Sequence, residues 1–188
     1  FFALPLMEKR SILRTRENPW GFYNQELTKN RRDWKEIFDF GPPETEVFPR
    51  AVPQWPPSLP TFEITMGAIF HACEQVAYQL LAGISLNLGL TERELFPDFG
   101  VAHTSFLRLN YYPVCNEPAN HSGISHHTDA GALTVLVHDQ QSGLEVLHDD
   151  TWYAVIPNPG TLLVNIGDVV QVWSNDEYSA PVHRVLAT

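Results

Sequence analysis

The stretch GISHHTDAGALTVLVHDQ, residues 123–140, decides the fold and places two adjacent histidines and an aspartate at the head of an apolar run. An apolar run of this kind is typical of a β-strand, and on a β-strand successive side chains point to opposite faces. His127 and Asp129 are therefore expected on one face, where they can bind a single ion together. His126 faces away, and we expect it to be packed or hydrogen-bonded on the reverse side.

After residue 104, apolar side chains recur at every second position through most of the chain. Short apolar segments follow one another, separated by turn signals such as SG, DD, NPG and SND. Their number and spacing predict an all-β sandwich, barrel or jelly roll. The predicted strands are 105–112, 123–128, 132–139, 143–150, 151–157, 160–167, 168–174 and 180–187.

The first part of the chain has a different pattern. Residues 1–13 predict the end of a helix, and residues 14–60 predict an irregular, Pro-rich segment with seven prolines between positions 42 and 60. Residues 61–88 carry apolar side chains at helical spacing and predict a long amphipathic helix that ends at Gly89. Gly67 and Gly83 argue against one unbroken helix.

Aromatic side chains are frequent in the segment 14–60. We expect them to pack onto a core, with the lining of a ligand pocket as the alternative use. They are Trp20, Phe22, Tyr23, Trp34, Phe38, Phe40, Phe48 and Trp55.

Composition excludes several classes of protein. The chain of 188 residues has a net charge of −10 and no large cluster of Lys and Arg, so a nucleic-acid-binding surface is not expected. No apolar stretch is long enough to span a bilayer. Cys73 and Cys115 form no disulfide framework and no metal knuckle, which predicts a reducing, cytoplasmic location. No feature of the sequence indicates an oligomeric state.

A third ligand for the site of His127 and Asp129 is expected from a neighbouring strand. Most of the other histidines lie at strand ends or in loops, namely His103, His121, His138 and His148. His183 instead lies inside an apolar strand, and a jelly roll brings late strands back beside early ones. We therefore predict a site of two histidines and one carboxylate.

This ligand set is that of the non-haem Fe(II) oxygenases. It occupies half of an octahedron and leaves the other half for a bidentate co-substrate and O2. Fe²⁺ and one aspartate leave one positive charge, which suits an anionic chelator. The same ligands could hold catalytic Zn²⁺ with a water molecule, so the ligands alone do not choose the metal.

Five motifs carry a resemblance to a known family. They are NYYP (110–113), HTD (127–129), NIGD (165–168), VWSN (172–175) and HR (183–184). Their order and spacing resemble those of the plant-type and bacterial 2-oxoglutarate- and Fe(II)-dependent dioxygenases, the isopenicillin N synthase-like superfamily. FFALP, DWKEIFDF and the long helix resemble the N-terminal half of that family. The resemblance covers nearly the whole chain and is strongest over residues 105–187.

The resemblance implies a fold that is mainly β with supporting α-helices. Residues 105–188 would form a double-stranded β-helix (a jelly-roll, cupin-like core), truncated at its C-terminus. Residues 1–104 would form a helical and Pro-rich region that packs on this core and does not fold independently.

The resemblance also implies residue roles. His127, Asp129 and His183 would bind Fe(II) and form the catalytic centre. Tyr112 would hydrogen-bond the distal carboxylate of 2-oxoglutarate, with Asn110 close to this co-substrate and Leu133 packed near it. The cofactors would be Fe(II), 2-oxoglutarate and O2, with ascorbate as a stimulant.

The implied reaction couples oxidative decarboxylation of 2-oxoglutarate to hydroxylation or desaturation of a small organic molecule, which the aromatic segment predicts to be apolar or aromatic. Segments 14–60 and 114–122 would build its pocket. The two alternatives are an iron oxidase of the same fold that does not use 2-oxoglutarate, and a non-catalytic jelly-roll binding module.

The family also has an R-x-S motif roughly ten residues beyond its second histidine, whose arginine pairs with the distal carboxylate of 2-oxoglutarate. Only five residues follow His183 here. We therefore expect the sequence to be a piece of a longer polypeptide and the given residues to bind 2-oxoglutarate weakly.

Overall fold

The computed structural model describes residues 1–42, 51–97 and 103–187. The chain divides into two compact units. Unit 1 consists of Phe1–Asn24 and Glu36–Tyr111, and unit 2 consists of Gln25–Lys35 and Tyr112–Thr188. Within the described part of the chain, no helix is long and apolar enough to cross a membrane.

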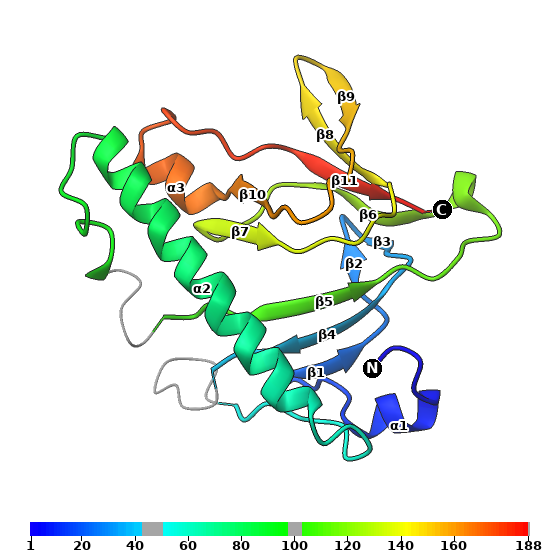
Figure 1. Cartoon of the computed structure of the whole chain (residues 1–188). Helices are drawn as coiled ribbons and strands as arrows, with labels where there is room; N and C mark the ends of the chain where they lie inside the picture. Colours follow the sequence, from blue (N-terminus) through cyan, green and yellow to red (C-terminus); the bar gives the residue numbers. More distant parts are fainter. Residues whose placement is uncertain (43–50, 98–102, 188) are drawn as a thin grey trace. The chain divides into compact units, whose positions relative to one another are not determined.

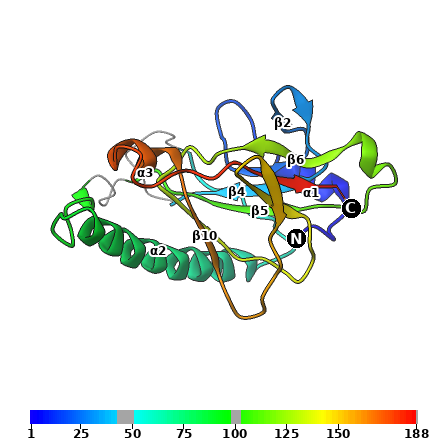
Figure 2. The ribbon, with the colours of Figure 1, turned by 90° about the horizontal axis from the view of Figure 1, so that it is seen from above.

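Unit 1 is an antiparallel sheet with one long helix beside it (Figure 1). The strand order is β1-β4-β5, so that β4 lies in the centre. Figure 2 shows α2 running alongside β4 and β5. The elements are α1 (Leu6–Ser11), β1 (Gly21–Tyr23), β4 (Glu36–Phe40), α2 (Phe62–Asn87) and β5 (Leu107–Tyr111).

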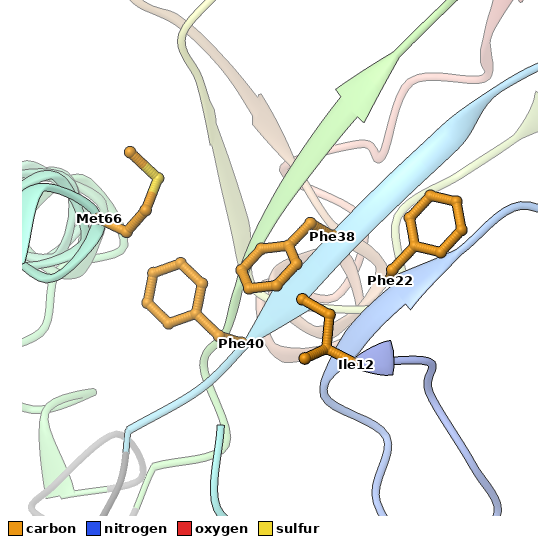
Figure 3. Packing of buried hydrophobic residues seen from close by; sticks show 5 residues of the cluster. All are labelled: Ile12, Phe22, Phe38, Phe40 and Met66. Atoms are coloured by element: carbon orange, nitrogen blue, oxygen red, sulfur yellow. The ribbon is translucent and has the colours of Figure 1, made fainter. Parts of the chain in front are cut away.

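Aromatic side chains fill the space between this sheet and α2. Phe38 and Phe40 are two positions apart on β4 and therefore share a face, on which they pack with Phe22, Ile12 and Met66 (Figure 3). Phe22 and Phe38 are fully buried. The prediction that the early aromatics pack onto a core is confirmed for these residues.

The same holds for Trp20, which is 6% exposed. Phe48 lies outside the described residues, as does the Pro-rich stretch 43–50.

The prediction of an irregular segment over residues 14–60 was wrong for β1 and β4. Ile37, Phe38, Asp39 and Phe40 are all buried, so β4 is covered on both faces. A strand buried on both faces shows no polar and apolar alternation, which is the signal by which strands are recognised.

The helix predictions had mixed outcomes. The long helix over 61–88 is confirmed as α2, and it is unbroken from Phe62 to Asn87. Gly67 and Gly83 lie on its exposed side, where a glycine costs helix propensity but no packing contact. The helix predicted within residues 1–13 is limited to α1.

Unit 2 contains two antiparallel sheets and a small hairpin. One sheet has the order β6-β11-β8-β9, and the other pairs β10 with β7. The hairpin is β2 (Leu27–Thr28) with β3 (Arg31–Arg32), and it joins the start of β6 through a bridge between Asp33 and Ser122. The remaining elements are η2 (Pro118–Asn120), β6 (Ser122–His127), β7 (Leu133–Leu136), β8 (Leu144–His148), β9 (Thr151–Ala154), β10 (Leu163–Ile166), α3 (Asp168–Trp173) and β11 (His183–Leu186).

The strand predicted over residues 168–174 was wrong, because this segment is the helix α3. Three of its residues are β-branched valines, and their propensity favours a strand. The N–H groups of Gly167, Asp168 and Val169 donate to carbonyl groups of residues 132, 129 and 131, so the chain turns sharply at the end of β10. Of the three valines only Val170 is buried, which is one stripe of a short helix.

Candidate metal centre

Three side chains of unit 2 converge at one end of its larger sheet. His127 is the last residue of β6, and His183 is the first residue of β11 and lies directly opposite it in the antiparallel register. Ligand atoms of His127, Asp129 and His183 all lie within 4.8 Å of one another. Asp129 Oδ1 is 3.7 Å from the Nε2 atom of each histidine.

His126 does not join this group. Its side chain is exposed, so the expectation that it would be packed on the reverse side was wrong. Because β6 ends at His127, strand alternation separates His126 from His127 but does not by itself place Asp129.

Backbone carbonyl groups fix the orientation of both imidazole rings. Nδ1 of His127 lies 2.8 Å from the carbonyl oxygen of Ser125, and Nδ1 of His183 lies 3.0 Å from that of Pro181. Because a carbonyl oxygen can only accept, each Nδ1 carries the proton and donates. In the neutral imidazole this leaves the lone pair on Nε2, as a metal ligand requires.

The electrostatics of His127 favour this neutral form. Burial lowers its pKa, and the neighbouring charges of His183 and Lys35 act in the same direction. The hydrogen bond to the Ser125 carbonyl and the charge of Asp129 act to raise the pKa, but the net shift is downward. His127 is therefore uncharged near neutral pH.

Asp129 is held by two hydrogen bonds to the same oxygen atom. Oδ2 accepts from the hydroxyl of Thr134 at 2.5 Å and from the amide of Asn165 at 2.8 Å. Burial alone would raise the pKa of Asp129, but these two hydrogen bonds and the facing histidines outweigh burial and lower it. The group is therefore a carboxylate at neutral pH.

The backbone of Asp129 is held in place as well. Its carbonyl oxygen accepts a 2.7 Å hydrogen bond from the N–H of Asp168, and Gly167 N–H donates to Ala132 at 2.8 Å. A Cβ atom at Gly167 would overlap the carbonyl oxygen of Gly131 and lie 2.9 Å from that of Asp129. Glycine is therefore required where the β10–α3 corner contacts the loop that carries Asp129.

The three residues predicted to bind the co-substrate lie in different places. Tyr112 is in unit 2, and a methyl group at Gly123 of β6 would lie 3.1 Å from its ring atoms Cδ1 and Cε1. Leu133 is half-buried on β7 and alternates with Thr134, so the two side chains point to opposite faces. Asn110 is exposed on β5 of unit 1, where it pairs with Ile37.

The roles of Thr134 and Asn165 were not predicted from the sequence. These two residues face each other in the register of β7 and β10, and both side chains reach Asp129. Each is a single polar residue inside an apolar strand, in ALTVL and LLVNIG. A half-buried polar side chain of this kind needs a hydrogen-bond partner, which is the signal that could have identified them.

The donor set fits a divalent transition metal. It offers the Nε2 atoms of two imidazoles and one carboxylate oxygen, and hydrogen bonds to the atoms that do not face the site orient all three groups. Such a set binds Fe(II) on one face of an octahedron, and the same ligand types occur in catalytic zinc sites. A site with three protein ligands leaves positions open for a chelating molecule.

Comparison with known proteins identifies the relatives of this chain. Residues 103–188 match the 2OG-Fe(II) oxygenase superfamily. Gibberellin 20 oxidase 2 of Oryza sativa subsp. indica is 33% identical over 192 residues, which cover 99% of this chain and 49% of the relative. The chain spans about half the length of the curated relatives it matches.

Solved structures share the fold. JOX2 in complex with 2OG, Fe and JA has a TM-score of 0.85 and 30% identity, covering 100% of this chain and 56% of that chain. A full-length Neurospora crassa protein in complex with alpha-KG and thymine has a TM-score of 0.84 and 27% identity, covering 99% of this chain and 62% of that chain. The predicted mainly β, jelly-roll fold with one long helix is confirmed. The family match over residues 103–188 and these relatives place this region of the chain in the 2OG-Fe(II) oxygenase superfamily.

Proposed function

We propose that this chain carries the catalytic core of a non-haem Fe(II) oxygenase. The reaction couples oxidative decarboxylation of 2-oxoglutarate to hydroxylation or desaturation of a small organic molecule. The observation that carries the proposal is the convergence of His127, Asp129 and His183, whose ligand atoms lie within 4.8 Å of one another. Both imidazoles present Nε2 to the same carboxylate oxygen.

In this proposal the three side chains hold Fe(II), which supplies the oxidising chemistry when O2 and 2-oxoglutarate are bound. The carbonyls of Ser125 and Pro181 keep the imidazoles in the ligand-competent tautomer. One positive charge remains on Fe(II) with a single carboxylate, and it attracts the anionic co-substrate.

The co-substrate roles of three residues belong to the same proposal. Tyr112 donates to the distal carboxylate of 2-oxoglutarate, and its position against Gly123 of β6, the strand that carries His127, supports this role. Asn110 is proposed to lie near the co-substrate, with support from the motif NYYP in which it occurs. Leu133 is proposed to pack near the co-substrate, with support from the family resemblance.

The substrate is proposed to be a small apolar or aromatic molecule. The solved relatives support a small-molecule substrate, since JOX2 holds JA and the Neurospora crassa protein holds thymine. We also propose a cytoplasmic location, which the free Cys73 and Cys115 support. We propose that the jelly-roll core comprises residues 105–188 and that residues 1–104 form the region that supports it. Ascorbate is proposed to stimulate turnover.

The test is an anaerobic titration of the protein with Fe(II) and then with 2-oxoglutarate. We expect a visible metal-to-ligand charge-transfer band and, after O2 is admitted, formation of succinate. His127→Ala should abolish the band. Tyr112→Phe keeps the ring and removes only the hydroxyl, so it should retain iron but need more 2-oxoglutarate to develop the band.

The alternatives give other results in the same experiment. Iron binding without a band at saturating 2-oxoglutarate would identify an oxidase that uses another co-substrate. A folded protein that binds no iron would be a binding module, and the proposal would be wrong. Zn²⁺ bound in preference to Fe(II), with hydrolytic and not oxidative chemistry, would also contradict it.

A further inference from the structure

The two oxygen atoms of the Asp129 carboxylate have different surroundings. Oδ1 lies 3.7 Å from Nε2 of both His127 and His183. Oδ2 points the other way and accepts hydrogen bonds from Thr134 and Asn165, at 2.5 Å and 2.8 Å. The asymmetry is built into the fold, because Thr134 and Asn165 are direct register partners on β7 and β10.

A carboxylate oxygen has two lone-pair sites. Thr134 and Asn165 together use both sites of Oδ2, since one donates a hydroxyl hydrogen and the other an amide hydrogen. Oδ1 is the oxygen that remains for a metal ion, and it is also the oxygen that faces the two histidines. Loss of either hydrogen bond would free a lone pair on Oδ2, and the carboxylate would then be able to bind a metal ion through both oxygens.

We infer that Thr134 and Asn165 are positioning residues that make Asp129 bind the metal ion through Oδ1 alone. The inference rests on the proposed function, since it concerns the same metal ion. With a one-oxygen aspartate, the three protein ligands occupy three positions and leave three open. A two-oxygen aspartate would take one of these open positions and compete with a bidentate co-substrate.

Charge-assisted hydrogen bonds support this role energetically. A hydrogen bond to an ionised group is stronger than one between neutral groups, and the pair also stabilises the carboxylate against protonation in a half-buried site. Because β-sheet pairing fixes the backbone of both donors, rotation of Asp129 about its Cβ–Cγ bond would break both hydrogen bonds at once.

The test compares Thr134→Val with Thr134→Ser, which keeps the hydroxyl, and with Asn165→Ala. Thr161→Val is a matched control, since its hydroxyl donates at 2.7 Å to the backbone carbonyl of Asn158 and not to a metal ligand. The protein is labelled with ¹³C at aspartate carboxylates, and the infrared difference spectrum is recorded on addition of Co(II). The separation of the antisymmetric and symmetric carboxylate stretches distinguishes one-oxygen from two-oxygen binding.

We expect a wide separation between the antisymmetric and symmetric carboxylate stretches in the wild type, in Thr134→Ser and in Thr161→Val. The separation should narrow in Thr134→Val and Asn165→Ala, while both variants still bind Co(II). In these two variants the affinity of the metal-loaded protein for 2-oxoglutarate should fall by about tenfold or more, because the second oxygen of Asp129 then competes with the co-substrate for one open position.

The possible failures are distinguishable. If both variants bind Co(II) and keep the wide separation, the inference is overturned and the proposed function stands. If the folded wild type binds neither Fe(II) nor Co(II), the proposed function fails and the inference fails with it. Should Thr134→Val not fold, Asn165→Ala decides the question, because it removes the other donor.

Discussion

Replacing Gly167 with alanine should damage the metal centre without changing any ligand. The backbone of Gly167 has φ −103° and ψ 174°, which alanine adopts without strain. The effect is therefore purely steric. A Cβ atom would overlap the Gly131 carbonyl oxygen and lie 2.7 Å from its carbonyl carbon and 2.9 Å from the Asp129 carbonyl oxygen. All of these are backbone atoms that cannot rotate away.

In the Gly167→Ala protein, the loop that carries Asp129 and Gly131 must then move away from the β10–α3 corner. Three hydrogen bonds cross this contact, donated by the N–H groups of residues 167, 168 and 169 at 2.8, 2.7 and 3.1 Å. Each contributes about 1 kcal/mol net, and overpacking costs about 1–3 kcal/mol. If the separation breaks two of the three bonds, the free energy of unfolding falls by about 3–5 kcal/mol, the overpacking cost included. With a urea slope of about 2 kcal/mol/M, the unfolding midpoint falls by about 1.5–2.5 M.

Urea unfolding followed by circular dichroism measures this shift, and a Co(II) titration measures the metal affinity, which should also fall because the Asp129 backbone moves. Gly131→Ala is the matched control. A Cβ atom there meets nothing within 4 Å, so the free energy of unfolding should change by no more than about 0.5 kcal/mol. A Gly167→Ala protein with the midpoint and metal affinity of the wild type would refute the steric argument.

Three further predictions concern other parts of unit 2. Gly123→Ala would press on Val185 Cγ1, 3.0 Å away, and on the ring of Tyr112, 3.1 Å away. Displacement of this ring should weaken 2-oxoglutarate binding by about tenfold at unchanged Co(II) affinity, since neither neighbour is a proposed metal ligand; equal effects on both ligands in parallel titrations would contradict it. Arg184→Ala removes a 3.9 Å stack on Trp152 and a 2.7 Å ion pair, and should cost about 1–2 kcal/mol in urea unfolding, of which Arg184→Lys recovers only part. The pKa of Asp129 lies below its ordinary value of 3.8, so the stability that its charge contributes is present above pH 3.8 and is lost as the pH falls through the lowered pKa. Asp129→Asn should therefore make the urea midpoint of the metal-free protein less sensitive to acid, and an unchanged acid dependence would show that the carboxylate adds no such stability.

The elements that could be predicted are those in which apolar residues recur at a regular spacing. The long helix α2 and most strands after residue 104 follow from helical spacing and from alternation. The central strand β4 was not predictable in this way, because Ile37 and Asp39 are as buried as Phe38 and Phe40. The helix α3 was not predictable from propensity either, since its start is fixed by hydrogen bonds to a loop more than thirty positions earlier.

The three residues of the candidate metal site could be named from the sequence, but the reason that they converge could not. Strand alternation separates His127 from His126, but β6 ends at His127, and Asp129 reaches the site because the corner after β10 holds its backbone. As single polar residues in apolar strands, Thr134 and Asn165 could be identified as candidates from the sequence, but their common partner Asp129 could not, because it depends on the register of β7 against β10. Register between strands thirty residues apart is a tertiary property that no local pattern records.

The most direct test of the account is the iron content of a pair of variants at adjacent histidines. His126 and His127 have the same chemistry and neighbouring backbones, but only His127 lies within reach of Asp129 and His183. Iron is measured after anaerobic equilibrium dialysis against Fe(II), with folding checked by circular dichroism. We predict one iron per chain in the wild type and in His126→Ala, and none in His127→Ala. Iron retained by a folded His127→Ala protein, or lost from His126→Ala instead, would contradict the central claim that His127, Asp129 and His183 form the metal centre.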